Sequence, residues 1–244
     1  ISLIRGKGLT VGVICVDPSS PVTGGAVLGD RIRMEQHYSD EGVFIRSMAS
    51  RGSLGGLAST THEASEAVEA AGYDWILIET VGVGQSEMEI VEAADTTVLV
   101  LVPESGDAVQ VMKAGLMEAG DIFVINKSDR EGGDRLEKEI SLLFDLARER
   151  NRETSGQEMP GWERRITKSV ATRGEGIEEL LEGIEAHRDF LRRDPARWAA
   201  HCEQRISARL RTHLRDRLLQ GIWGAGHMDE WMAHGLDRIR KGET

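Results

Sequence analysis

The sequence predicts an α/β fold, in which a doubly wound and mainly parallel sheet is followed by a C-terminal helical extension. Short apolar runs alternate with helical segments of about ten to fifteen residues, which is the pattern of right-handed βαβ crossovers. Several of these runs are apolar throughout and stop at a polar residue, as strands buried on both faces of a parallel sheet do. Beyond residue 190 no further strand pattern occurs, and Leu, Trp, His and Arg recur at helical spacing.

The expected elements follow one another along one main domain. Strands are expected at 10–16, 43–46, 75–78, 96–102, 121–125 and 166–171. Helices are expected at 60–71, at 135–150 and from 177 onward, and residues 1–8 have the pattern of a helix end closed by glycine. The main domain is assigned to 1–190 and the extension to 191–244, with a helix break at 221–224 and a last helix around Trp231. The apolar stripe of the extension must either pack on the main domain or form a homodimer arm, and the sequence favours neither.

Composition excludes several classes of protein. A formal net charge of -11 over 244 residues argues against a general nucleic-acid or anionic-membrane binder, because such surfaces need clustered Lys and Arg. No run is apolar for long enough to span a membrane. Two cysteines, Cys15 and Cys202, provide no disulfide framework, and the seven histidines lack metal-binding spacing. We expect a cytoplasmic protein, or one of the mitochondrial matrix if the organism is eukaryotic.

The run from Asp74 to Glu87 has the features of a nucleotide-sensing switch. Its apolar strand stops at Glu79, and the ligands of parallel sheets bind beyond the carboxyl ends of the strands. Gly82 and Gly84 carry no side chains, so backbone amides there can approach a terminal phosphate. A strand that ends in an ordinary glycine-rich turn explains these residues about equally well.

Two carboxylates flank the loop that follows the first expected strand. Asp17 ends that strand, and Asp30 lies at the far side of the loop. Carboxylate oxygens suit a hard cation such as Mg²⁺, which usually keeps several waters. The residues alone favour a plainer interpretation, in which Asp17-Pro18 starts a turn and Asp30 caps the next helix.

The tetrad Asn126-Lys127-Ser128-Asp129 is the most specific motif of the chain. The carboxylate of Asp129 can accept hydrogen bonds from the ring N1–H and the exocyclic amine of guanine, a donor pair that adenine lacks. Lys127 would lay its aliphatic stem along the base, Asn126 would join neighbouring loops, and the amide of Ala171 would donate to guanine O6. The alternative is a chance tetrad in a turn. Its place directly after a buried strand favours the functional interpretation.

Four segments together resemble one family. They are Val16-Asp17-Pro18-Ser19-Ser20, Thr23-Gly24-Gly25 with Leu28-Gly29-Asp30-Arg31, Glu79 to Glu87, and Asn126 to Asp129. In this order and spacing they are similar to the P-loop GTPase chaperones of adenosylcobalamin-dependent methylmalonyl-CoA mutase, which include the fused chaperone domain of isobutyryl-CoA mutase and proteins once assigned as LAO/AO transport system kinases. The likeness covers most of residues 1–185. It implies a sheet of the P-loop NTPase type that binds GTP or GDP together with Mg²⁺.

The resemblance also implies roles for individual residues. The acids associated with Mg²⁺ are then Asp17, Asp30 and Glu79. The residues that read guanine are Asn126, Lys127 and Asp129, with support from Ala171. The residues tied to hydrolysis are Glu79, Gly82 at the γ-phosphate, and Asp107 and Lys113 in an additional switch at 103–115.

The implied activity is GTP hydrolysis coupled to the care of an adenosylcobalamin-dependent acyl-CoA mutase. Such a chaperone gates cofactor delivery and protects the mutase from inactivation, and we expect a homodimer without nucleic-acid or membrane partners. The phosphate loop of the family, G-x-x-x-x-G-K-[ST], occurs nowhere in these 244 residues, and Gly6-Lys7-Gly8 lacks its spacing. We therefore expect these residues to be part of a longer GTPase. Two other functions stay open: a non-catalytic homologue that only binds a partner, and a nickel-type metallochaperone GTPase.

Overall fold

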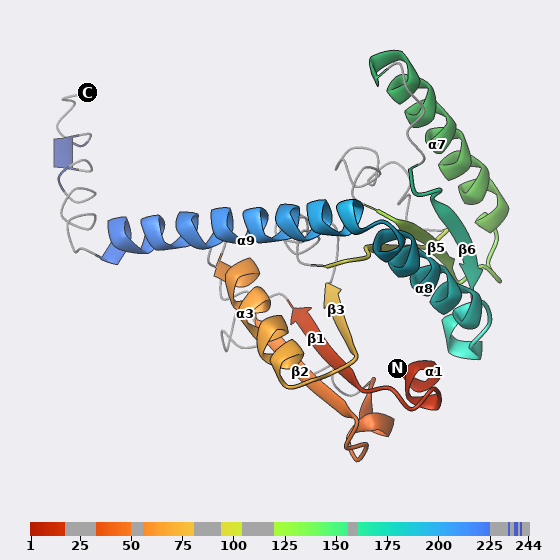
Figure 1. Cartoon of the computed structure of the whole chain (residues 1–244), viewed down its shortest axis with the longest axis horizontal. Helices are drawn as coiled ribbons and strands as arrows, with labels where there is room; N and C mark the ends of the chain where they lie inside the picture. Colours follow the sequence, from red (N-terminus) through yellow and green to blue (C-terminus); the bar gives the residue numbers. More distant parts are fainter. Residues whose placement is uncertain are drawn as a thin grey trace.

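Two parallel sheets form the centre of the molecule (Figure 1). The computed structural model describes residues 1–17, 33–49, 56–80, 94–103, 120–155 and 161–224, together with 234, 237, 238 and 240. Within this part the first sheet has the order β2-β1-β3, with the strands β1 (Val11–Asp17), β2 (Val43–Ala49) and β3 (Trp75–Thr80). The second sheet has the order β4-β5-β6, with the strands β4 (Val98–Leu101), β5 (Ile122–Asn126) and β6 (Arg165–Ser169). The prediction of a parallel α/β fold is confirmed.

Helices precede and follow the strands as expected, with small differences at their ends. The α-helices of the described residues are α1 (Ser2–Gly6), α3 (Gly56–Ala70), α7 (Gly133–Ser155), α8 (Ile177–Arg193) and α9 (Pro195–Gly224). Two 3₁₀ turns are η1 (Glu35–His37) and η2 (Ala171–Arg173). The expected helix at 60–71 begins earlier, and the strand expected at 166–171 ends at Ser169 because the chain turns into η2 there.

The first sheet is covered on both faces. Alternate residues of β1 serve opposite faces, as the pleat of a strand requires. One set joins a buried cluster with α1 and α8, made of Ile4, Val11, Val13, Cys15 and Leu181. The other set, Ile14 and Val16, packs beside Ala64 of α3. The close approach of α3 depends on Gly12, because a Cβ atom there would lie 2.2 Å from Cγ1 of Val68.

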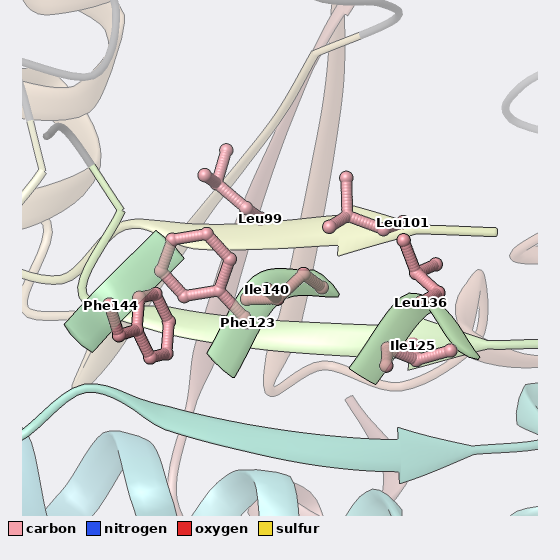
Figure 2. Packing of buried hydrophobic residues seen from close by; sticks show 7 residues of the cluster. All are labelled: Leu99, Leu101, Phe123, Ile125, Leu136, Ile140 and Phe144. Carbon is pink, nitrogen blue, oxygen red and sulfur yellow. The ribbon is translucent and has the colours of Figure 1, made fainter. Parts of the chain in front are cut away.

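The second sheet is built around β5, whose residues Ile122 to Ile125 are at most 2% exposed. β5 packs under α7 in a cluster of Leu99, Leu101, Phe123, Ile125, Leu136, Ile140 and Phe144 (Figure 2). The rings of Phe123 and Phe144 meet edge to face, with their centroids 4.9 Å apart. Burial of one such aromatic side chain contributes about 1.5 to 3 kcal/mol, so the cluster stabilises the packing of α7 on the second sheet.

Helix α8 packs against both sheets. Its Leu181 belongs to the cluster of the first sheet, whereas a Cβ on Gly183 would lie only 3.7 Å from Cδ1 of Ile122 in the second. His187 is 3% exposed, and its Nδ1 lies 2.8 Å from Oγ1 of Thr96, just before β4. The two sheets are therefore held side by side by one helix.

Helix α9 crosses α3 and then extends away from the sheets (Figure 1). Arg205 pairs with Asp95, and Arg209 pairs with Glu66 of α3. The helix continues through Gly221 and ends at Gly224, the last residue of the segment in which a break is expected. Four apolar side chains at a spacing of four residues are each more than half exposed: Ile206, Leu210, Leu214 and Leu218.

Among the described helices, none combines the length and the apolar character of a membrane span.

Two strands are less buried than expected. Every residue of β3 is only half-buried, and Val100 of β4 is 59% exposed. In the described part of the chain β3 pairs only with β1, and β4 pairs only with β5. Each of the two strands thus has one edge without a neighbour there. Both strands are therefore less buried than the sequence predicts, although residues of β3 pack in the clusters on both faces of the first sheet.

Candidate functional site

The Asn-Lys-x-Asp tetrad lies at the carboxyl edge of the second sheet. Asn126 is the last residue of β5 and stands in register with Ser169, the last residue of β6. Ser128 donates from its backbone N–H and from its hydroxyl to the carbonyl oxygen of Ser169, at 3.1 Å in each case. These bonds hold together the loops that follow the two strands.

Asn126 makes the second tie between these loops. Its Oδ1 accepts hydrogen bonds from the backbone N–H of Ala171 at 3.1 Å and from the hydroxyl of Ser169 at 3.3 Å. Ala171 lies in the turn η2, beyond the end of β6. The Ala171 amide, which the sequence suggests as a donor to guanine, is thus already bonded within the chain.

Lys127 and Asp129 are the tetrad residues that face solvent. Lys127 has a φ of 56°, the only positive φ of a non-glycine residue in the described parts of the chain. This left-handed conformation costs about 1 kcal/mol or more and persists only where surrounding bonds enforce it. Two hydrogen bonds hold this conformation. The carbonyl of Lys127 accepts from the N–H of Arg130 at 3.0 Å, and the N–H of Ser128 donates to the carbonyl of Ser169. The strained backbone presents both side chains on the same short loop.

The loop after β6 is a tight turn whose Arg173 side chain approaches Asp129. The N–H of Val170 donates to the carbonyl of Glu175 at 3.1 Å, which closes the loop. Gly176 has a φ of +74°, and a Cβ there would lie 2.0 Å from the carbonyl oxygen of Lys168. Only glycine fits this position. The loop brings the guanidinium of Arg173 to 3.6 Å from Oδ2 of Asp129.

Lys168 fastens the start of α7 to β6, close to the same edge. Its Nζ lies 2.7 Å from Oδ1 of Asp134 and 2.6 Å from Oε2 of Glu137. Hydrogen bonds to Asp134 and then to Glu137 raise the pKa of Lys168, and the hydrogen bond from Lys168 lowers the pKa of Asp134. Lys168 and Asp134 therefore keep opposite charges at neutral pH. Together with Glu137 they form a charged clamp beside the tetrad.

The first sheet carries Asp17 and Glu79, two of the three acids expected near the phosphates. Glu79 lies in β3 opposite Cys15 of β1, and its Oε1 is 3.3 Å from a guanidinium nitrogen of Arg33. β1 ends at Asp17, for which the structure describes the backbone. The structure therefore brings Asp17 and Glu79 to neighbouring strands of one sheet, apart from the tetrad on the other.

Other expected residues lie outside the described parts of the chain, namely Asp30, Gly82, Asp107 and Lys113. No group of three or more His, Cys, Asp or Glu side chains suited to a metal ion occurs among the residues that are described. Mg²⁺ ligation by Asp17, Asp30 and Glu79 thus stays a prediction from the sequence.

Sequence reasoning missed two charged residues of the site. Arg173 approaches Asp129, and Lys168 pairs with Asp134 at the start of α7. Neither residue belongs to a recognisable motif, so the sequence does not indicate its role. Both positions depend on the register between β5 and β6, which joins residues about 40 apart and leaves no local signal.

Comparisons with known proteins agree on one family. A family model described as methylmalonyl-CoA mutase-associated GTPase MeaB matches residues 1–227. A putative GTPase of Pyrococcus abyssi is 56% identical over 189 residues, which are 78% of this chain and 56% of that protein. The mouse protein named methylmalonic aciduria type A homolog, mitochondrial, is 39% identical over 183 residues, which are 74% of this chain and 42% of that protein. A crystal structure of a LAO/AO transport system kinase superposes with a TM-score of 0.62 at 25% identity, over 100% of this chain and 70% of that one. The chain thus spans little more than half the length of the Pyrococcus relative.

Two glycines of the loop after β6 allow a matched test of its packing. Gly174 and Gly176 have nearly the same positive φ, but a Cβ would meet nothing within 4 Å at Gly174 and would clash with the Lys168 carbonyl at Gly176. We expect Gly174→Ala to cost about 1 kcal/mol, the left-handed penalty alone. Gly176→Ala should lower the free energy of unfolding several-fold more, measured by urea denaturation. Equal losses for the two variants would contradict this account of the loop.

Proposed function

Because the chain belongs to the family of methylmalonyl-CoA mutase-associated GTPases, we propose that it binds and hydrolyses GTP as the chaperone of an adenosylcobalamin-dependent acyl-CoA mutase. In this role it gates delivery of the cofactor and protects the mutase. The observation that carries the proposal is the exposed carboxylate of Asp129, on a loop that Asn126 and Ser128 tie to the next strand end. A carboxylate that reads a base needs such a fixed position, because its two bonds must match one base edge.

The base-reading step follows from donor chemistry. Asp129 would accept the N1–H and the exocyclic amine of guanine, whereas adenine would present an acceptor and leave the charge unpaired. The aliphatic stem of Lys127 would cover the face of the base. The amide of Ala171 is bonded to Asn126, so we assign Ala171 the role of positioning its turn beside the base.

The phosphate end of the site is proposed for the first sheet. Asp17 and Glu79 lie on the neighbouring strands β1 and β3, and Asp30 completes the proposed set of acids. Carboxylate oxygens are the ligand chemistry that Mg²⁺ prefers. When bound, the ion would neutralise charge on the β- and γ-phosphates.

Hydrolysis is assigned to the residues implied by the family likeness. Gly82 would leave its backbone amide free to approach the γ-phosphate, since it carries no side chain. Lys113, with Asp107 in the same switch, would place a positive charge near the charge that develops on the transferred phosphate. Glu79 would act beside them at the end of β3.

A phosphate loop is the part that these residues do not supply. No G-x-x-x-x-G-K-[ST] occurs in the sequence. The edges of β3 and β4 that have no neighbour in the described residues could each accept one further parallel strand. We therefore propose hydrolysis for the protein expressed from its complete gene, in which a strand and phosphate loop of this kind would lie beside them.

The missing phosphate-loop motif also suggests a second candidate function, that of a non-catalytic binding module. A homologue without the phosphate loop would bind its partner through the switch surfaces without turnover. The two functions differ in one measurable property, GTP hydrolysis stimulated by the partner.

A single substitution tests the base-reading role. In the protein expressed from its complete gene, Asp129→Asn should weaken GDP binding by at least about tenfold, the loss expected when a bidentate charged pair becomes a mismatched amide. The same variant should gain affinity for xanthosine diphosphate, whose extra carbonyl complements an amide donor. Isothermal titration calorimetry with both nucleotides measures the switch. Unchanged preference for guanine would remove Asp129 from the base site.

The mutase role is tested with methylmalonyl-CoA mutase from the same organism. With a non-hydrolysable GTP analogue, the two proteins should co-elute on size exclusion, and the mutase should raise the rate of GTP hydrolysis. Asp129→Ala serves as the control that abolishes this stimulation. Co-elution without hydrolysis would favour the non-catalytic binding module. The chaperone proposal fails if no complex forms with either nucleotide state.

The apolar stripe of α9 is proposed as the homodimer contact. Ile206, Leu210, Leu214 and Leu218 share one side of a helix that extends beyond the sheets (Figure 1). A second copy offers the same stripe, so a two-fold pairing of the helices would cover both at once.

Charge introduced on the stripe should separate the two copies. We expect Leu210→Glu with Leu214→Glu to yield monomers by sedimentation, because four buried charges would face one another in the dimer. Leu142→Glu with Leu146→Glu on α7 is the matched control, with the same spacing and similar exposure. It should leave the dimer intact. A dimer that survives the α9 substitutions would place the contact elsewhere.

A further inference from the structure

The carboxylate proposed to read guanine already has a partner in the chain. A guanidinium nitrogen of Arg173 lies 3.6 Å from Oδ2 of Asp129. From its other side the same guanidinium is held by Glu175, whose Oε1 lies 3.0 Å from Nε of Arg173. Arg173 therefore stands between two carboxylates, of which only Asp129 belongs to the base-reading tetrad.

A guanidinium resembles the edge of guanine that Asp129 would bind. Both present N–H donors in a planar fork, and both suit a carboxylate acceptor. Arg173 and guanine thus compete for the same oxygen atoms. One of them must leave before the other can bind fully.

The backbone under Arg173 is fixed by hydrogen bonds, whereas its side chain is half exposed to solvent. The turn η2 is bonded to Asn126 through the amide of Ala171 and closed by the bond from Val170 to Glu175. The side chain of Arg173 is 53% exposed, and that of Asp129 is 44% exposed. The long arginine can therefore change partner without any change in the loop.

We propose that Arg173 is an internal placeholder for guanine, which pairs with Asp129 when the base site is empty and retreats to Glu175 when guanine binds. The inference rests on the proposed function, because it assumes that Asp129 reads guanine. Arg173 is then an affinity-determining residue. It lowers the affinity for nucleotide by the free energy of its pair with Asp129, and it keeps other cations from the empty carboxylate.

The size of the effect follows from the exposure of the pair. Exposed ion pairs are weak, and their removal changes an equilibrium by about 1.5- to 5-fold. We expect Arg173→Ala to lower the Kd for GDP by about two- to fivefold, measured by calorimetry on the protein expressed from its complete gene. Arg148→Ala is the charge-matched control, since Arg148 pairs with the exposed Glu163 away from the site, and it should leave the Kd unchanged. Unchanged or weaker GDP binding by Arg173→Ala would overturn the proposal.

Two further variants separate a placeholder from a merely structural arginine. Glu175→Gln removes the alternative partner, so it should weaken GDP binding a few-fold when Arg173 is present and not at all in the Arg173→Ala background. In Asp129→Asn protein, where the ion pair is gone, Arg173→Ala should no longer tighten binding of xanthosine diphosphate. A gain that persists in that background would also overturn the placeholder.

The outcomes distinguish this inference from the function on which it rests. If wild-type protein binds GDP and Asp129→Ala does not, the base-reading role stands whatever Arg173→Ala does. If Asp129→Ala binds GDP as well as wild type, the base-reading role fails, and the placeholder fails with it.

Discussion

The packing of α8 against both sheets is the contact on which the rest of the described structure depends. The two sheets share no strand pairing there, so their relative position is set by side chains of helices. Leu181 enters the core of the first sheet, while Gly183 of the same helix lies beside Ile122 in the second. Near its middle α8 is further fixed by the ion pair of Glu185 with Lys7 and by the hydrogen bond between His187 and Thr96. Because such contacts combine close packing with satisfied polar groups, they define one arrangement rather than a sliding interface.

The sequence predicts the positions of the strands well, because each strand is a local run of apolar residues. The run at 122–125 is apolar at every position and forms the buried strand that it predicts. The run at 75–78 looks the same in the sequence, yet β3 is half-buried because it has only one neighbour in the described residues. Apolar composition shows that a strand is suited to burial. Whether the strand is buried depends on neighbouring elements that come from distant parts of the chain. Gly221 shows a related limit, because it lies inside α9 and weakens the helix without ending it.

The same distinction divides the candidate site. The tetrad at 126–129 could be found because its residues are adjacent and follow a buried strand. The bond from Ala171 to Asn126, the charged clamp of Lys168 and the approach of Arg173 could not, because each joins β5 or α7 to the segment around β6. Even the glycines at 174 and 176 look equivalent in the sequence, although only Gly176 is pressed against a carbonyl oxygen. Residue type identifies the chemistry, whereas register decides which groups meet.

Helix α9 connects the proposed dimer surface to both halves of the site. Arg209 binds Glu66 on α3, which covers the first sheet, and Arg205 binds Asp95, which lies in the segment before β4 of the second sheet. His62 of α3 is buried at this contact, and burial together with the charges of Arg209 and Arg205 lowers its pKa. His62 is therefore neutral at neutral pH and adds no like charge beside the arginines. A partner that moved α9 would act on α3 and on the start of β4 together. Asp17 and Glu79, two of the acids proposed for Mg²⁺, lie on the first sheet and the guanine-reading tetrad on the second, so such a movement would change the relation between the two ends of one nucleotide.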